Sequence, residues 1–322
     1  MNYTDIIKRA ARLTWRYKVL WILGILLALS GGSGGGNSIT YTLNGNGGGG
    51  DMVPPMFPNW NFPDPGVIAG FVLLCCCLLA VLLVVLTIVQ YVARTGLYRA
   101  VDQIEGTGVA PNWREGLRLG WNNRAVRMFL LDLIVGIAVF IVVIALLLLA
   151  ASPLLLFIFD NEALSIIGGI ATAGLMFLAI LIIAAAVVVV SVLQQFWRRQ
   201  IALDDRSVGE ALSLGTQMAR RKAGDVAILW LLMAVIGVLF AIVLIPVVIG
   251  LGLLGGGIGA ALGYAVYSLT NSVGWAVLLG LPVFMLIMVV PLIFVQGVYL
   301  VFESSTWTLA YRDLAAVPEQ TV

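Results

Sequence analysis

Long runs of apolar residues dominate this sequence and decide which solvent the chain folds in. They lie at about 18–31, 67–92, 127–150, 164–193, 226–252 and 274–301. All but the first exceed the roughly 20 residues that a helix needs to cross the hydrocarbon core of a bilayer. Only 11% of the residues are charged, against roughly 25% in soluble domains. We therefore expect an all-α integral membrane protein, a polytopic transmembrane helical bundle of about six spans, with residues 1–322 forming a single transmembrane domain.

The first apolar run is the weakest of the six. Its uncharged stretch, from Val19 to Leu29, is short and follows Lys8, Arg9, Arg12, Arg16 and Lys18. A basic segment before a short apolar run is also typical of a secretory signal peptide, and Ala28-Leu29-Ser30 would suit its cleavage. The sequence leaves open whether this segment is retained or cleaved. We favour a retained span, because the repeat described below uses the segment as a normal unit.

The basic residues all fall on one side of the six-span arrangement. The 18 Lys and Arg residues lie within 8–18, 94–127 and 198–222 or at Arg312. The opposite loops, at 31–66, 151–163 and 253–273, hold no basic residue but contain Asp51, Asp64, Asp160 and Glu162. By the positive-inside rule the basic side is cytoplasmic. We expect a multi-pass protein of the cytoplasmic (inner) membrane, with the N-terminus, the C-terminus and a tail at 303–322 inside.

The first outer loop, at 31–66, is rich in glycine, asparagine and proline. Its glycine-rich first part predicts a flexible tether. Its later part places Met56, Phe57, Trp60 and Phe62 among prolines, a composition that suits folding back onto the outer membrane face. A phosphate-binding loop is excluded, because the segment has no lysine and no Gly-Lys-Ser/Thr ending.

Three stretches on the basic side resemble one another. They are AARLTWRYKVLWIL at 10–23, GLRLGWNNRAVRMFLL at 116–131 and ALSLGTQMARRKAGDVAILWLL at 211–232. Each is a short amphipathic segment, then a basic cluster, then an apolar run. We therefore predict three pseudo-repeats, each an interfacial amphipathic helix followed by a transmembrane hairpin.

Two parts of the third repeat carry a family resemblance. The stretch IALDDRSVGEALSLGTQMARRKAGDVAILWLL, at 201–232, resembles the start of a recurring hairpin in poorly characterised membrane proteins related to the membrane domain of glycerophosphoryl diester phosphodiesterase. The ending SSTWTLAYRDL, at 304–314, is similar to the end of that domain. In that family the catalytic domain is a separate soluble barrel, whose histidines this chain lacks. The resemblance implies a stand-alone membrane domain and assigns no catalytic residue.

Basic clusters beside the spans are the first candidate contacts. They are Arg198, Arg199, Arg220, Arg221 and Lys222. Arginines near the inner headgroups can meet anionic lipid phosphates or an acidic partner. Positive-inside bias alone also predicts such clusters, so plain anchoring remains the simpler interpretation.

Acidic residues near the spans are the second candidates. Asp132 lies in the third span, Asp225 opens the fifth and Glu303 closes the sixth. Basic neighbours available to neutralise them are Arg124, Arg127, Arg221 and Lys222. We expect a ring of interfacial ion pairs, because a proton- or ion-coupled transporter more often places its acids near the midplane.

Other polar and small residues punctuate the spans. Gln90, Gln194 and Gln296 recur near the inner ends of the second, fourth and sixth spans. Hydrogen bonds between helices would explain them. The more specific alternative is a polar vestibule that faces the cytoplasm. The last hairpin contains Pro246, Pro282 and Pro291, and glycines between Gly250 and Gly257 follow the fifth span. Kinked helices around a cavity and close packing through small residues both fit this pattern.

The composition argues against most catalytic sites. There is no histidine, which removes the commonest general base and the main nitrogen ligand for zinc. Cys75, Cys76 and Cys77 are consecutive in an apolar run and point about 100° apart, so they cannot bridge one another. We expect no enzyme, cofactor, metal site or nucleic acid. An intramembrane enzyme is the least favoured reading, for want of paired midplane aspartates or a serine–base pair.

The expected function is therefore that of a lipid- or partner-binding scaffold or accessory protein. Its partners would be membrane lipids and another membrane protein or a second copy of the chain. The alternative is a transporter or permease-like subunit for a small or amphipathic substrate. A continuous polar path between the two membrane faces would favour the transporter over the scaffold. The spans are too apolar to line a wide path.

Overall fold

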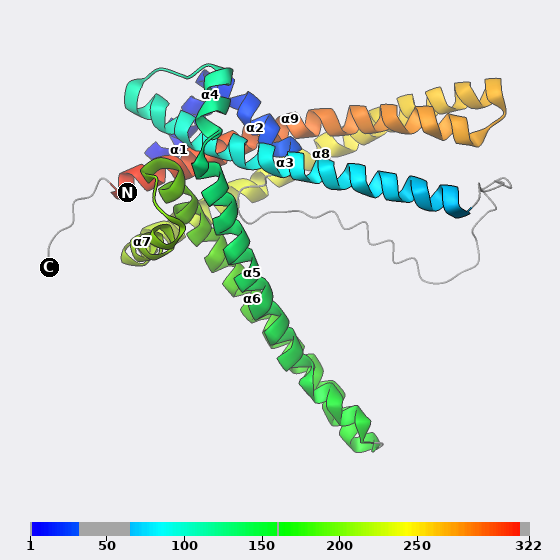
Figure 1. Ribbon diagram of the computed structural model, residues 1–322, viewed down its shortest axis with the longest axis horizontal. Coiled ribbons are helices and arrows are strands. Elements are labelled where there is room, and N and C mark those ends of the chain that lie inside the picture. The colour runs from blue at the N-terminus through cyan, green and yellow to red at the C-terminus, as the bar shows by residue number, and fades with distance from the viewer. Residues whose placement is uncertain (1, 32–64, 160, 316–322) are drawn as a thin grey trace.

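The computed structural model describes residues 2–31, 65–159 and 161–315, and no strand occurs among them. In chain order the helices are α1 (Tyr3–Arg16), α2 (Val19–Leu29), α3 (Pro65–Thr107), α4 (Trp113–Gly120), α5 (Asn123–Ala151), the 3-10 helix η1 (Ser152–Ile158), α6 (Glu162–Asp204), α7 (Val208–Arg221), α8 (Ala223–Thr270) and α9 (Val273–Ala315) (Figure 1). The predicted all-α class is confirmed. Nearly all of the predicted outer loop at 31–66 lies outside the described residues.

Five helical stretches are long and apolar enough to cross a membrane. They are Cys76–Thr107, Asn123–Ile158, Glu162–Asp204, Ala223–Thr270 and Val273–Ala315. Their length and composition are compatible with a multi-pass membrane protein. α2 is apolar but has only 11 residues, about half of what a span requires. The predicted first span is therefore shorter in the structure than a complete crossing.

The long helices exceed the thickness of a bilayer. α3, α6 and α9 have 43 residues each, which corresponds to about 65 Å, whereas the hydrocarbon core is about 30 Å thick. The surplus length lies at their C-terminal ends, where buried residues concentrate. There the three helices contact one another and the shorter helices. We call this region, with α1, α2, α4 and α7 and the first turns of α5 and α8, the junction.

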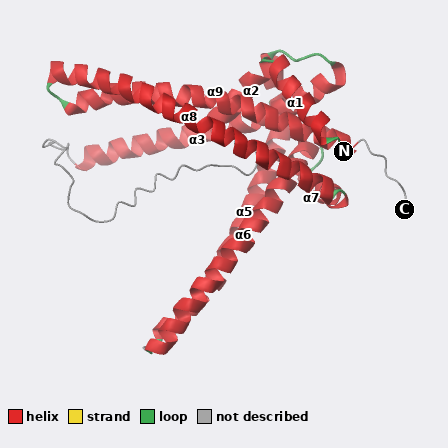
Figure 2. Ribbon diagram, turned by 180° about the vertical axis from the view of Figure 1, so that it is seen from behind, coloured by secondary structure: helices red, strands yellow, loops and turns green. Residues whose placement is uncertain are grey.

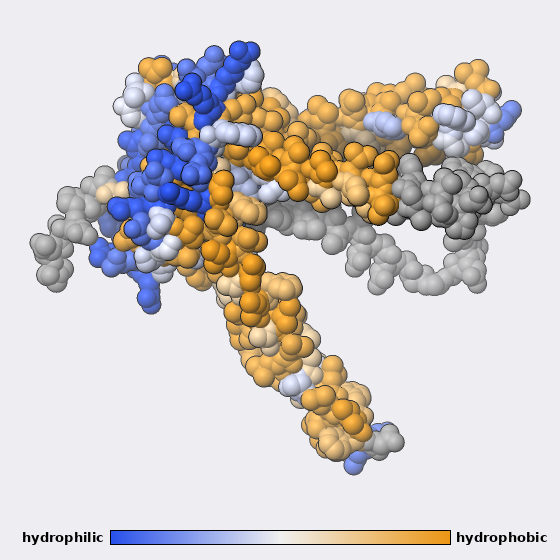
Figure 3. Space-filling model, viewed as in Figure 1, coloured by the Kyte–Doolittle hydropathy of each residue, from blue (hydrophilic) through white to orange (hydrophobic). Residues whose placement is uncertain are grey.

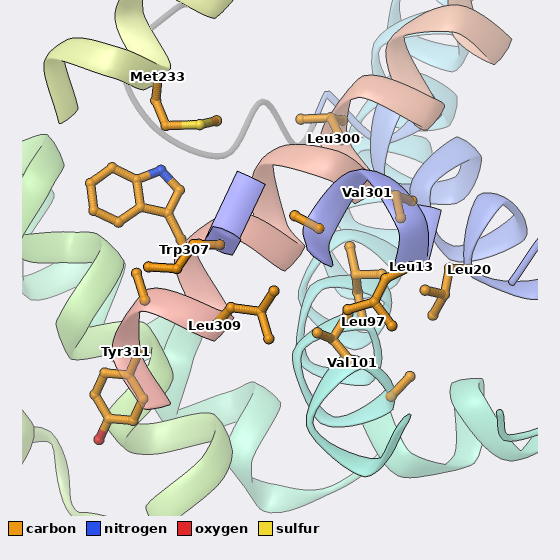
Figure 4. Close-up of a cluster of buried hydrophobic side chains, with 14 of the residues drawn as sticks. Leu13, Leu20, Leu97, Val101, Met233, Leu300, Val301, Trp307, Leu309 and Tyr311 are labelled. Carbon is orange, nitrogen blue, oxygen red and sulfur yellow. The ribbon is translucent and has the colours of Figure 1, made fainter. Parts of the chain in front are cut away.

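The junction contains the main hydrophobic core. Side chains from α1, α2, α3, α8 and α9 meet there, among them Leu13, Leu20, Leu97, Met233 and Trp307 (Figure 4). Leu97 and Val301 are fully buried. On the outside of the same region, hydrophilic residues gather in Figure 3, while the helices that leave it are apolar. The junction is thus the part of the molecule that packs like an ordinary protein interior.

Two helical hairpins leave the junction in different directions. The α5–α6 arm comprises α5, η1 and the N-terminal part of α6, and the α8–α9 arm comprises α8 and the N-terminal part of α9. Figures 1 and 2 show from opposite sides that the α5–α6 arm diverges from α3 and from the α8–α9 arm. In the most apolar window of each long helix, at most 11% of residues are buried. Most side chains in those windows are therefore at least partly exposed within the described chain.

Each short amphipathic helix packs on a long helix. α4 begins with a capping box of Asn112 and Glu115, and α7 begins with one of Ser207 and Glu210, so both N-termini are satisfied locally. α4 contacts α3, the long helix before it, and α7 contacts α6 in the same way. α1 contacts α9, the last helix of the chain. The buried side of α1 includes Ile6 and Ala10, so this helix packs into the junction.

The predicted outer loop at 253–273 is wrong, because α8 continues as a helix to Thr270. Its glycines pack against α9: a Cβ placed at Gly259 would lie 2.9 Å from the Gly280 carbonyl oxygen, and one at Gly280 would lie 2.6 Å from the Gly259 oxygen. Glycine here permits close approach of two helices, as in small-residue seams of membrane proteins. The glycines therefore mark a helix–helix contact.

Two further features concern the last two helices. Pro246, Pro282 and Pro291 lie inside α8 and α9 and end neither helix. Residues 303–315, predicted as part of a tail, form the last turns of α9 and are largely buried, because they pack in the junction. Residues 316–322 lie outside the described range.

Candidate functional site

The predicted basic contacts separate into a buried pair and an exposed group. Arg198 and Arg199, near the C-terminal end of α6, are buried in the junction. Arg220 and Arg221 end α7 and are exposed, and Lys222 follows them. A helix C-terminus attracts cations through its partial negative charge. The exposed group is thus the part of the predicted set that a headgroup or partner can reach.

The outer face of α7 forms a shallow open depression that ends at these cations. Its lining residues are Gly209, Leu212, Ser213, Leu214, Thr216, Gln217, Arg220 and Arg221. Leu214 is exposed. The same helix also presents hydroxyl groups, an amide group and the two guanidinium groups to this depression. An apolar strip beside polar and cationic groups matches the chemistry of a membrane interface.

Asp132 on α5 holds together the buried arginines. Its Oδ1 accepts a hydrogen bond from Arg198 Nε at 2.9 Å, and its Oδ2 lies 3.5 Å from Arg94 Nη1. Tyr91 also donates its hydroxyl to Oδ2 at 3.1 Å. These contacts tie α5 to α3 and α6. A single carboxylate therefore serves two buried guanidinium groups.

The basic partners predicted for Asp132 pair with another acid. Arg124 Nε and Arg127 Nη1 each lie 3.2 Å from Asp205 Oδ1. Arg124 also donates to the Ala202 carbonyl oxygen at 2.8 Å, which fixes the end of α6 beside α5. The Asp132 side chain is only 12% exposed, so it is more buried than that of Asp205. Its partners are Arg94 of α3 and Arg198 of α6.

Arg199 is buried among neutral acceptors. Its Nη1 donates to the Gln195 main-chain oxygen at 2.7 Å and to Gln195 Oε1 at 2.8 Å. Its Nε donates to Thr308 Oγ1 and its Nη2 to the Ser304 carbonyl oxygen, both at 3.2 Å. The Tyr98 ring lies 4.6 Å from the guanidinium carbon. Arg199 thereby joins α6 to α9 and to the aromatic face of α3.

Arg94 and Arg199 both line a small cavity in the junction. The residues around it are Leu27, Arg94, Tyr98, Gln195, Arg199, Leu300, Glu303 and Ser304. They come from α2, α3, α6 and α9. Its free volume is about 10 Å³, close to the smallest that can hold one water molecule. We refer to Arg94, Arg198, Arg199, Asp132 and Glu303 as the arginine cluster.

The three predicted glutamines differ in their environments. Gln194 accepts from Arg198 Nη2 at 3.2 Å, so it supports the arginine cluster. Gln90 and Gln296 are half-buried on α3 and α9. The neighbouring Gln195, which the sequence interpretation did not single out, contacts Arg199 directly.

A second set of polar contacts ties α1 to the junction. Arg9 lies 3.0 Å from Glu105, 3.1 Å from Asp313 and 3.1 Å from Asp5. Burial alone would lower the pKa of Arg9, but these carboxylates outweigh it and raise the pKa. Tyr3 donates its hydroxyl to Asp225, and this hydrogen bond raises the pKa of Tyr3. Asp225 thus anchors α1 on α8.

Sequence interpretation missed Arg94 and Tyr98 as members of the site. Arg94 was grouped with the other basic residues of the cytoplasmic side, although it follows an apolar stretch and is only 2% exposed. The sequence does contain a signal for Arg94. This arginine follows Gln90 by four residues, or about one helical turn, and Arg198 follows Gln194 on α6 at the same spacing. Arginines within an apolar helix need a buried partner, so they indicate a polar interior.

Comparisons with known proteins identify the family of the chain. The model of a family of unknown function (DUF7544) matches residues 8–309. No curated protein and no solved structure matches the chain. Among the described residues, no group of three or more Cys, Asp or Glu side chains is placed to hold a metal ion.

Proposed function

We propose that this chain, which belongs to the family of unknown function DUF7544, is an inner-membrane scaffold that binds anionic lipid headgroups along α7 and extends helical arms into the bilayer. The observation that carries this proposal is the exposure of the arms. Apolar side chains cover them on all sides, and little of that surface is buried by the protein. Such surface requires lipid tails or a membrane partner around it.

The polar residues of the arms favour a scaffold over a transporter. Thr87 donates to the Leu83 oxygen at 2.7 Å, Thr172 to the Gly168 oxygen at 2.8 Å and Ser191 to the Val188 oxygen at 2.8 Å. Each hydroxyl is thus satisfied within its own helix. A transporter would need polar groups from different helices facing one path. The diverging hairpins do not bring such groups together in the described chain.

The lipid-binding part of the proposal rests on α7. Arg220, Arg221 and Lys222 stand at one end of an open face that also carries Leu214. Guanidinium groups bind phosphate oxygens through paired hydrogen bonds, and anionic lipids attract such cations at the cytoplasmic leaflet. Exposed Trp113 and Trp121 at the same end suit the headgroup region.

We also propose that three units, α1–α3, α4–α6 and α7–α9, are related by pseudo-threefold repetition. The pattern of helix contacts supports this proposal. α4 and α7, the first helices of the second and third units, pack on α3 and α6, the last helices of the units before them. α1 packs on α9, the last helix of the third unit, so the pattern is cyclic. In this proposal α2 counts as the first of six membrane segments, and both termini are cytoplasmic. The relationship to the membrane domain of glycerophosphoryl diester phosphodiesterase remains a proposal that rests on 201–232 and 304–314.

Native mass spectrometry of protein purified in mild detergent tests the lipid proposal. The test variant replaces Arg220, Arg221 and Lys222 by Gln. The matched control replaces Lys8, Arg12 and Arg16 on α1 by Gln, which removes the same charge from another exposed face. We expect phosphatidylglycerol to be retained by the wild type and the control and to be lost from the α7 variant.

Equal retention in all three proteins, or equal loss from both variants, would refute a site on α7. A protein that co-purifies in fixed stoichiometry, with no anionic lipid, would replace the lipid by a membrane partner. A second copy of the chain would appear as a dimer mass in the same spectra.

A further inference from the structure

We propose that the arginine cluster binds one small monovalent anion of chloride size in the cavity between α2, α3, α6 and α9. The site differs from the α7 face in location and in ligand, and it does not depend on lipid binding there. The argument rests on charge, on unpartnered donors and on size.

The charges of the cluster do not balance. Three guanidinium groups, of Arg94, Arg198 and Arg199, are at least nine-tenths buried. The carboxylates of the cluster are those of Asp132 and Glu303. By formal charge the cluster therefore carries an excess of at least one positive charge. An uncompensated charge in a low-dielectric interior is costly, and one monovalent anion would neutralise it.

Several donors of the cluster have unused capacity. Arg94 Nε, Arg198 Nη1 and Ser304 Oγ are buried and have no hydrogen-bond partner among residues 2–31, 65–159 and 161–315. Arg94 and Ser304 line the cavity itself. Because buried polar groups are nearly always hydrogen-bonded, such atoms at one cavity indicate a ligand that accepts hydrogen bonds.

The existing partners cannot supply that acceptor. Asp132 already receives Arg198 at 2.9 Å and Tyr91 at 3.1 Å, and its contact with Arg94 is long at 3.5 Å. The hydrogen bonds of Arg199 go to neutral oxygens, and the Glu303 carboxylate on the cavity wall is already counted against the three guanidinium charges. The Tyr98 ring covers one face of Arg199. An anion between Arg94 and Arg199 would meet both charges at once.

The size of the cavity selects the kind of anion. A free volume of about 10 Å³ suits one water-sized sphere and excludes a tetrahedral phosphate or sulfate. Leu27 and Leu300 form the apolar part of its wall, which disfavours a strongly hydrated ion. A halide satisfies the charge and the donors, and a monatomic anion requires less expansion of this cavity than a polyatomic one.

Thermal unfolding in nanodiscs tests the proposal. We compare sodium chloride and sodium bromide with sodium gluconate at equal ionic strength. The halides are expected to raise the unfolding midpoint by several degrees in a saturable manner, because a ligand that binds only the folded state stabilises it. The same rise in gluconate, or a rise that follows ionic strength without saturation, would overturn the proposal.

Two variants and one control make the test specific. Arg94→Met should abolish the halide response, while Arg220→Gln on α7 should retain it. Because Arg94→Met also removes a partner of Asp132 and is at risk of misfolding, Glu303→Gln provides the second variant. It removes a negative charge from the cavity wall, so the halide concentration at half-saturation should fall about tenfold or more.

An unchanged half-saturation in Glu303→Gln would refute the site. Bromide anomalous scattering or a bound halide in a high-resolution map provides the direct readout, with density expected within hydrogen-bond distance of Arg94 and Arg199. A lipid phosphate found in that position would overturn the assignment to a free halide. Failure of the lipid-retention test on α7 would leave the halide result unaffected.

Discussion

The junction and the arms are built from the same helices but follow different rules. At the junction, α3, α6 and α9 pack against one another and bury charged groups such as Arg94 and Arg199. Along the arms, α6 and α9 expose long apolar side chains, and within the described chain their main contacts there are with their hairpin partners α5 and α8. Lipid tails are as apolar as leucine, so they provide no hydrophobic force that closes the arms. The comparison teaches that tertiary stability resides in the junction.

The largest effect should come from breaking the arginine cluster. Asp132→Asn leaves Arg94 and Arg198 without their shared carboxylate. Removal of one partner of a buried ion pair typically costs about 3–5 kcal/mol of the free energy of unfolding. We expect poor folding or a much lower unfolding midpoint, measured by thermal unfolding in nanodiscs. A variant as stable as the wild type would contradict the structural role of this pair.

The next largest difference is expected when a leucine is truncated to alanine in the junction and on an arm. Leu97 in the junction is 0% exposed, whereas Leu148 on the α5–α6 arm is 67% exposed. Leu97→Ala should destabilise the protein by about 2–5 kcal/mol, because it leaves a cavity in a packed core. Leu148→Ala removes contacts mainly with lipid and should change the unfolding midpoint little. Equal losses would show that the arms are packed as tightly as the junction.

Much of this contrast could be predicted from the sequence. The apolar runs predicted the arms, and the stretches before Val19, Asn123 and Ala223 predicted the short helices of the junction. The direction of the arms could not be predicted, because a helix that is apolar on every side carries no periodic signal for a neighbour. The partners of Asp132 were also missed, since Arg94 and Arg198 are distant in the sequence and reach it only when three helices meet.

Glycine substitution provides a finer test. A Cβ at Gly120 would lie 2.0 Å from the Val92 carbonyl oxygen, where α4 crosses α3. Gly120→Ala should therefore force α4 away and cost about 1–3 kcal/mol, as overpacking does. Gly136 on α5 has no atom within 4 Å of its Cβ position among the described residues. Gly136→Ala should be neutral or slightly stabilising, because alanine favours helix.

A reversal of these two results, read from the unfolding midpoints of both variants, would mean that α4 does not sit on α3. The glycines also illustrate a limit of sequence interpretation. Gly255, Gly259 and Gly263 fell within the predicted outer loop at 253–273, although close packing through small residues was one of the two interpretations of the glycines that follow the fifth span. Their role becomes clear only when α9 is placed against them.

The smallest effect is expected for the exposed ion pairs at the edge of the junction. The Asp205 side chain is 53% exposed and pairs with Arg124 and Arg127. Asp205→Asn should cost no more than about 1 kcal/mol, because solvent screens such pairs. Asparagine also tolerates the left-handed backbone found there, with φ of 56°. A loss as large as that of Asp132→Asn would place Asp205 in the structural core.

The most direct test of the central claim measures the distances between the arms in a bilayer. Pairs of spin labels are introduced by cysteine substitution of Glu162 with Thr270, at the two arm tips, and of Arg206 with Ala223, at the junction, after Cys75, Cys76 and Cys77 are replaced by Ser. In nanodiscs the tip-to-tip distance should clearly exceed the junction distance. Equal distances in the two pairs would mean that the hairpins close into a parallel bundle, which would contradict the division between a packed junction and lipid-facing arms.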